Sequence, residues 1–258
     1  GDNLQLRIRI QNQGEVRADD VRAVLAGINI QDWKATWGRG EMIPIGYLLP
    51  PDRIQGTEGQ TAQDIFDLTA PALPKGTTQQ FSPQVRVYYK YKTTAVKSIT
   101  LVNEQELRRL QDQGKTLSST DTKTSAGPLK VTVTTGKFIK AREVSTSYFS
   151  NIFPITIDIQ NIGGGVVSDK DRPQDDYKVN IRVDYPTNRL TILSCKELND
   201  GYVTLWKGQD ASITCNIQIN SPPLTNEDEN LKITLDYPYY IDSKTTITVT
   251  GTQEGFFL

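Results

Sequence analysis

The chain has 258 residues with 29 Lys and Arg, 30 Asp and Glu, and no histidine. A net charge of −1 gives no electrostatic reason to bind nucleic acid, so no nucleic-acid partner is expected. The absence of histidine removes the commonest general base and metal ligand. No apolar stretch is long enough to cross a bilayer, so no transmembrane segment is expected within these residues.

The first predicted strand, residues 4–11, alternates leucine or isoleucine with glutamine or arginine, and it opens an internal repeat. Three pairs of segments match in the same order, at an offset of 149 or 148 positions: Ile8–Gly14 with Ile157–Gly163, Val85–Tyr91 with Ile233–Tyr239, and Ser98–Leu101 with Thr246–Val249. The repeat predicts two homologous modules in tandem. Period-two alternation in each predicts an all-β fold of two tandem immunoglobulin-like antiparallel β-sandwiches.

Each copy of the repeated strand ends in Asn-x-Gly, a pattern that invites a ligand-binding interpretation. The structural interpretation is stronger, because asparagine often ends a strand and glycine accepts a positive φ in the following turn. We therefore expect Asn12 with Gly14, and Asn161 with Gly163, to form turns rather than binding sites.

The first module is expected to span residues 1–102, with an irregular insertion between residues 33 and 74. Within the insertion, Trp33, Trp37 and Arg39 are the best candidates for a contact surface, because aromatic and arginine side chains commonly anchor interfaces. The alternative is that both tryptophans cap the core of the module.

Tyrosines gather on the two matching strands at 85–91 and 233–240, which suggests a platform for sugar stacking. Alternation instead places most of these rings on the apolar face, where a buried ring with its hydroxyl at the rim is ordinary. Only Tyr88 and Tyr240 are expected to point outward, and they join the candidate contact residues.

Residues 103–127 are expected to join the modules through a short helix and a Ser/Thr-rich linker. Asn103 can cap the helix, Glu106 lies at the capping-box position, and Gly114 can end it. The segment that follows, 115–127, is rich in serine and threonine and poor in large apolar residues, which predicts a flexible or loosely ordered linker.

The second module is expected to span residues 128–251, followed by an apolar tail at 252–258. It opens with the alternating strand Leu129–Thr134, for which the first module has no counterpart. The first module is therefore expected to lack its own first strand. Upstream residues, the 33–74 insertion or a segment of another chain could complete its sheet.

The acidic loop at 169–176 is a weak candidate for a calcium site, because Ca²⁺ takes carboxylate oxygens. It lacks the ligand spacing of an EF-hand, and one lysine and one arginine offset its charge, so a solvated loop is favoured and no metal is expected. The loop contains four aspartates: Asp169, Asp171, Asp175 and Asp176.

The two cysteines, Cys195 and Cys215, cannot supply a four-ligand zinc site, and no histidine is present to activate a catalytic thiol. A disulfide or two buried free thiols remain. The disulfide is favoured, because a strand ending at Cys195 and a strand through Cys215 could be neighbours. Such a bond would place the protein outside the reducing cytosol.

The Ile-Gln-Asn-x-Gly strand, followed by an alternating strand and then by the glycine-led strand Lys207–Thr214, resembles the CARDB modules. These are adhesion-related immunoglobulin-like modules that occur in tandem on archaeal and bacterial surface proteins. The resemblance implies an immunoglobulin-like fold and a secreted or cell-surface location. The family shares no catalytic residues, so the resemblance assigns none.

No nucleophile elbow or phosphate-binding loop is present, so we expect no catalytic residues, no cofactor and no enzymatic activity. The sequence favours a non-enzymatic structural and interaction fragment of a larger extracellular or cell-surface protein, acting as spacer and adhesion modules. Its partners would be neighbouring domains of the same polypeptide, other copies of itself, or surface proteins and glycans. The alternatives are a carbohydrate-binding adhesin and accessory domains of a secreted hydrolase.

Overall fold

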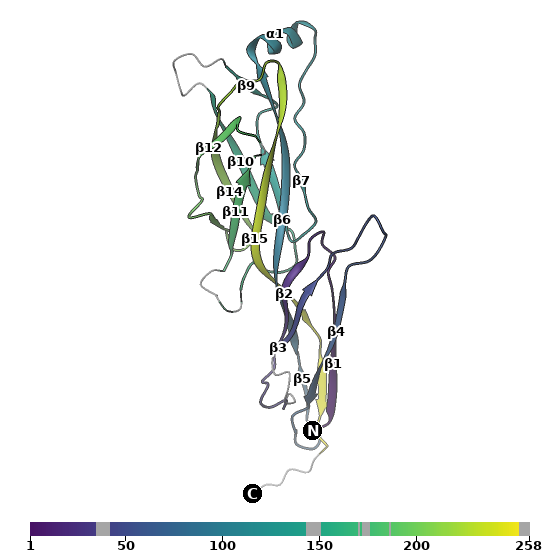
Figure 1. Cartoon of the computed structure of the whole chain (residues 1–258). Helices are drawn as coiled ribbons and strands as arrows, with labels where there is room; N and C mark the ends of the chain where they lie inside the picture. Colours follow the sequence, from purple (N-terminus) through teal and green to yellow (C-terminus); the bar gives the residue numbers. More distant parts are fainter. Residues whose placement is uncertain (35–41, 143–150, 170, 172–175, 186, 253–258) are drawn as a thin grey trace. The chain divides into compact units, whose positions relative to one another are not determined.

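A computed structural model describes residues 1–34, 42–142, 151–169, 171, 176–185 and 187–252 (Figure 1). Apart from one helix, its described regular elements are β-strands, paired antiparallel except for β9 (Ile139–Ala141) on β6 (Gln84–Asn103), and they form a sandwich-like all-β fold. The fold class expected from period-two alternation is therefore confirmed.

The chain forms two compact units, and neither unit is a single continuous segment. Unit 1 contains Gly1–Tyr91, Gly164–Pro173 and Pro238–Leu258, whereas unit 2 contains Lys92–Gly163 and Gln174–Tyr237. These ranges differ from the expected division into 1–102 and 128–251. The apolar tail expected at 252–258 lies, except for residue 252, outside the described residues.

Unit 2 is built around a four-stranded sheet with the order β12–β14–β10–β8. Alternate side chains of the last three strands point into the core, and each of them is at most 3 % exposed: Val131, Val133, Ile155, Ile157, Ile159, Ile213, Cys215 and Ile217. The strands are β8 (Leu129–Thr134), β10 (Ile152–Asn161), β12 (Leu190–Cys195) and β14 (Asp210–Ile219).

The other sheet has the order β13–β11–β15–β6–β2–β3, and its two long central strands contribute residues to both units. Two short strands, β7 and β9, also pair with β6. The members are β2 (Ala18–Ala26), β3 (Met42–Leu48), β6 (Gln84–Asn103), β7 (Lys123–Thr124), β9 (Ile139–Ala141), β11 (Lys178–Asp184), β13 (Tyr202–Thr204) and β15 (Asn226–Lys244).

Unit 1 also contains two separate strand pairs (Figure 1). In the first, β1 (Asn3–Gln11) pairs with β4 (Thr61–Thr69), and in the second, β5 (Thr78–Phe81) pairs with β16 (Ile247–Thr250). The 33–74 insertion therefore supplies β4 to one edge of β1, as well as β3 to the edge of β2.

Strand registers confirm the internal repeat. Gln11 faces Thr61 in unit 1, and Gln160 faces Asp210 in unit 2, so both pairs match at the offset of 149 positions. Equivalent backbone hydrogen bonds follow where the two strands end. The Asn12 N–H donates to the Gln60 carbonyl at 3.1 Å, and the Asn161 N–H donates to the Gln209 carbonyl at 2.7 Å. The pair β1–β4 is thus the counterpart of β10–β14.

The two repeats exchange their last strands. The segment Ser98–Leu101 belongs to the first repeat but lies in unit 2. Its match, Thr246–Val249, belongs to the second repeat but lies in unit 1. In unit 2, Thr100 Oγ1 donates to Asp228 Oδ1 of β15 at 2.6 Å. In unit 1, the C-terminal segment pairs as β16 with β5. Each repeat is therefore completed by a strand of the other.

The exchange has a cause in the local sequence. Residues 92–97, Lys-Thr-Thr-Ala-Val-Lys, and residues 240–245, Tyr-Ile-Asp-Ser-Lys-Thr, contain no glycine, asparagine or proline. A tight hairpin needs residues that tolerate a positive φ, whereas threonine, valine, isoleucine and tyrosine favour extended backbone. The chain therefore continues straight after Tyr91 as part of the 20-residue strand β6.

The expected helix is confirmed as α1 (Glu104–Asp112). The side chain of Asn103 accepts a hydrogen bond from the Glu106 N–H at 2.7 Å, and Gly114 adopts a φ of +67° after the helix.

The segment after the helix, expected to be a flexible or loosely ordered linker, is instead held against the sheet. The buried Lys97 donates to Ser119 Oγ at 3.0 Å and to the Thr120 carbonyl, and β7 pairs with β6.

Strand exchange predicts that a fragment ending at residue 116 will not fold, although it contains the whole expected first module. It lacks all of β15 and β16, including the part of β15 that belongs to unit 1, so it should show no cooperative thermal transition in circular dichroism. The matched control is the full chain cleaved at a protease site placed between residues 116 and 117. Its two pieces should co-elute in gel filtration and melt cooperatively; two separable, independently folded pieces would contradict the exchange.

Candidate functional site

The Asn-x-Gly elements serve the fold. The Nδ2 group of Asn12 donates to the carbonyls of Val16 and Leu48, both at 2.9 Å, and its Oδ1 accepts from the Gly14 N–H at 2.9 Å. In the second copy, Asn161 Nδ2 donates to the Gly208 carbonyl at 3.0 Å, and Asn161 Oδ1 accepts from the Gly163 N–H at 3.1 Å. The expected turns are present, but neither turn glycine has a positive φ, so that part of the prediction is wrong.

The two cysteines form the predicted disulfide. Cys195 of β12 lies directly opposite Cys215 of β14, and the described chain has no free cysteine. The bond joins neighbouring strands of one sheet, as their spacing suggested. It leaves no thiol for catalysis or metal binding.

The tryptophan surface expected in the insertion is not borne out for Trp33. Its side chain is 1 % exposed and packs edge to face on Phe81, with ring centroids 5.1 Å apart, so it belongs to the core. Trp37 and Arg39 lie outside the described residues. The core-capping alternative is the one that fits Trp33.

The two tyrosines expected to point outward form a packed cluster in unit 1. Tyr88 is buried, which corrects its expected exposure, and its ring lies 5.4 Å from the half-buried ring of Tyr240. The Arg86 guanidinium lies 4.0 Å from the Tyr240 centroid and forms two hydrogen bonds with Asp242, at 2.7 and 2.9 Å. The cluster ties β6 to β15 and leaves little ring surface for stacking a sugar.

Two inward-facing tyrosines support equivalent corners of the repeats. The hydroxyl of Tyr91 accepts from the Val16 N–H at 3.2 Å, and the hydroxyl of Tyr239 accepts from the Gly165 N–H at 3.0 Å. Both rings are at most 5 % exposed. These hydroxyls satisfy backbone donors just after each Asn-x-Gly turn, so their role is structural.

Two aspartates of the acidic loop contact the guanidinium group of Arg22. Arg22 Nη1 donates to Asp171 Oδ2 at 2.8 Å, and Arg22 Nη2 lies 3.6 Å from Asp169 Oδ1. Asp175 lies outside the described residues, and Asp176 is half-buried. Among the described residues, no group of three or more acidic or cysteine side chains could hold a metal ion.

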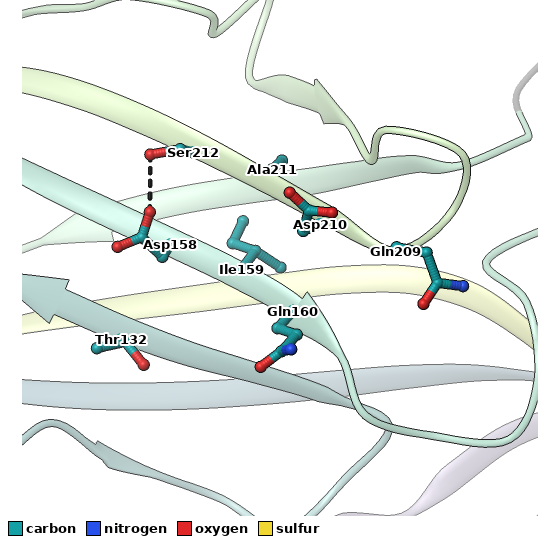
Figure 2. A pocket seen from close by; sticks show the side chains of 8 residues that line it. All are labelled: Thr132, Asp158, Ile159, Gln160, Gln209, Asp210, Ala211 and Ser212. Atoms are coloured by element: carbon teal, nitrogen blue, oxygen red, sulfur yellow. Dashed lines mark hydrogen bonds between the residues drawn. The ribbon is translucent and has the colours of Figure 1, made fainter.

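A polar groove of about 290 Å³ lies on the outer face of β8, β10 and β14 in unit 2 (Figure 2). Asp158 accepts a hydrogen bond from Ser212 at 2.7 Å, and Gln160 and Asp210 extend the polar rim (Figure 2). Its lining is Thr132, Asp158, Ile159, Gln160, Gln209, Asp210, Ala211 and Ser212. The groove offers carboxylates, amides and hydroxyls for hydrogen bonding, without an aromatic ring or a thiol.

A second groove, of about 560 Å³, lies on the corresponding face of unit 1. It is formed by β1 and β4, which are the counterparts of β10 and β14, but its lining carries different charges. The residues are Arg7, Ile8, Gln63, Asp64, Ile65 and Asp67. The corresponding grooves of the two repeats thus differ in charge.

Sequence reasoning missed β4, although a signal for it was present. Gly59-Gln60-Thr61-Ala62 matches Gly208-Gln209-Asp210-Ala211 at the same offset of 149 positions. The match is Gly-Gln-x-Ala, and it marks the start of β4 and of β14. A Cβ atom at Gly59 would lie 1.8 Å from the Asn12 carbonyl oxygen, so only glycine fits there.

No protein-family model matches the chain, and no curated protein sequence is similar to it. Among solved structures, the envelope protein VP37 of White Spot Syndrome Virus is similar to part of it, with a TM-score of 0.28 and 9 % identity. That alignment covers 59 % of this chain and 98 % of the viral chain. A likeness of this size carries no functional argument. The described residues include no helix long and apolar enough to cross a membrane.

Replacing Arg22 should destabilise unit 1 by about 2 kcal/mol, because Asp169 is only 7 % exposed and would lose its cationic neighbour. The test is chemical denaturation of Arg22→Met. Arg17→Met is the matched control, since Arg17 forms an exposed pair with Asp19 that is worth about 0.5 kcal/mol or less. Equal losses in the two variants would show that the Arg22 cluster is not structurally important.

Melting temperature should change little between about pH 6 and 8, because the chain has no histidine. Burial raises the pKa of Tyr89 and raises that of Tyr185 to about 12, whereas an unfolded tyrosine titrates near about 10. The contribution of these tyrosines to the free energy of unfolding is present below about pH 10, and it is lost as the pH rises through their pKa values in the folded protein. A hydrogen bond from Lys140 lowers the pKa of Glu104, whose contribution is therefore lost as the pH falls below about 4.5.

Circular dichroism melts from pH 3 to 11 check this profile. Stability should fall at both ends of the range and stay level in the middle. A steep change between pH 6 and 8 would contradict it, and would indicate a strongly shifted carboxylate of the kind found in active sites.

Proposed function

We propose that the chain is a non-enzymatic structural and interaction segment of a larger extracellular or cell-surface protein. The observation that carries this proposal is the disulfide between Cys195 and Cys215. Structural disulfides persist in oxidising compartments and are rare in the cytosol. The chain then acts as a spacer that also presents surfaces to other surface proteins.

The spacer role is supported by the way in which chemistry-bearing side chains are used. The asparagines of the turns, Tyr91 of β6 with Tyr239 of β15, and Arg22 all form hydrogen bonds within the protein itself. The exchanged strands also mean that each unit depends on a segment of the other repeat. A module of this kind resists separation of its parts, which suits a load-bearing spacer.

The carbohydrate-binding alternative rests on the polar groove of β8, β10 and β14 (Figure 2). Its amides and carboxylates could bond to sugar hydroxyls. The groove contains no aromatic side chain to stack on a sugar ring, and ligand sites usually include apolar and aromatic surface. We therefore favour a protein partner over a glycan. A catalytic domain in the same polypeptide would instead support an accessory role in a secreted hydrolase.

The location is tested by protease treatment and antibody labelling of intact source cells, combined with alkylation of the unreduced protein. We expect the protein to be accessible from outside and both cysteines to resist alkylation. A protein found in the cytosol with two alkylated cysteines would overturn the proposal.

A glycan array separates the leading function from its first alternative. The proposal expects no selective binding. Selective binding that is lost in Asp158→Asn and Asp210→Asn, but kept in the exposed control Asp228→Asn, would establish the adhesin function in its place.

A further inference from the structure

Strand exchange returns the chain to the unit in which it begins. Strand β1 starts unit 1, and the chain comes back to unit 1 at Pro238, after the segment Gln174–Tyr237 has been built into unit 2. The last described strand, β16, pairs with β5 of unit 1. Two modules in simple tandem would place one end of the chain in each module. Here both described ends belong to the same unit.

The loop between β4 and β5, residues 70–77, holds both ends. At its start, the Ala70 N–H donates to the Asp2 carbonyl at 2.9 Å. At its far side, the Gly251 N–H donates to the Thr77 carbonyl at 2.8 Å. A Cβ atom at Gly251 would lie 2.0 Å from the Pro74 carbonyl oxygen, so the backbones are in direct contact there as well.

The length of this loop limits the distance between the two ends. Residues 70 and 74 are four positions apart, which a fully extended chain spans in about 14 Å. Adding about 5 Å for each pair of contacting backbones gives about 25 Å at most between residues 2 and 251. Two modules in line, each about as long as a strand of nine residues, would separate the ends by about 60 Å.

We propose that the chain joins its longer polypeptide through unit 1 alone, so that unit 2 is a side branch of that polypeptide and not one of its successive links. A segment that enters before β1 and a segment that leaves after β16 would both attach beside the loop 70–77. Ends that lie close together are what allow a domain to be inserted into a longer chain.

The inference rests on the proposed role as part of a larger protein, and it decides between the two halves of that role. The chain lengthens the polypeptide by about 25 Å at most, which is little for its 258 residues. Its main contribution is then the presentation of unit 2 to partners, and spacing is secondary.

Energy transfer between dyes at the two ends tests the proposal on the intact chain. The dyes are attached through Asp2→Cys and Thr252→Cys, and both positions are exposed. We expect the folded protein to give a separation of about 25 Å, apart from the length of the dye linkers. The same labelled chain in denaturant is the control, and its transfer should fall sharply. A separation near about 60 Å in the folded protein would overturn the proposal.

A circular permutant supplies an independent test. A glycine and serine linker of about twelve residues, which reaches about 40 Å, joins residue 252 to residue 1, and new ends are opened between residues 116 and 117. Such a linker spans ends that lie about 25 Å apart but not ends that lie about 60 Å apart. We expect the permutant to melt cooperatively, within about 5 °C of the unpermuted chain.

The unpermuted chain cleaved between residues 116 and 117 is the matched control, because it contains the same break without the linker. A permutant that fails to fold while this cleaved chain folds would show that the ends cannot be joined, and the proposal would be wrong. Neither experiment depends on the extracellular location, which alkylation and labelling of intact cells measure separately.

Discussion

The fold depends on two strands that do not turn back. After the tyrosine-rich segment of each repeat, β6 and β15 continue without the glycine or asparagine that a tight hairpin requires. They lie side by side as neighbours in one sheet (Figure 1), tied by Arg86 to Asp242 in unit 1 and by Lys92 to Asp236 in unit 2. Because each strand begins in one unit and ends in the other, each unit is closed by a segment of the other repeat, and the stability of one unit is linked to that of the other.

The same constraint explains the use of the tyrosines. An extended strand shared by two units has to keep its register over an unusual length, and side-chain contacts between β6 and β15 provide that register. Thr93 Oγ1 and the Tyr237 hydroxyl lie 2.7 Å apart in the core of unit 2, and the Tyr89 and Tyr239 rings lie 5.7 Å apart in unit 1. Aromatic residues that sequence analysis offers as a sugar platform are therefore largely taken up in joining strands.

Local features were predictable from the sequence, and long-range exchange was not. Alternation in residues 4–11 identified a strand, Asn103 identified a helix start, and the isolation of Cys195 and Cys215 identified a disulfide, since each depends on nearby residues or on elimination. Which strand lies beside Ser98–Leu101 depends on a partner more than a hundred residues away, and an alternating strand fits several neighbours equally well. The candidate site was harder still, because Trp33 and Tyr88 have the composition of an interface but the burial of a core.

The differences between the repeats are therefore more informative about function than their similarities. What the copies share holds the backbone in place: the asparagine of each turn and the corner tyrosine form hydrogen bonds with backbone groups, and Gly59 lies where a side chain would collide with the backbone. One sheet differs clearly between them: Arg7 and Arg9 stand where the second repeat has Thr156 and Asp158, and Asp64 stands where it has Ile213. Side chains that hold each repeat together are therefore kept in both copies, whereas the side chains of this sheet differ in charge, and a surface that differs between two copies of one fold can serve different contacts.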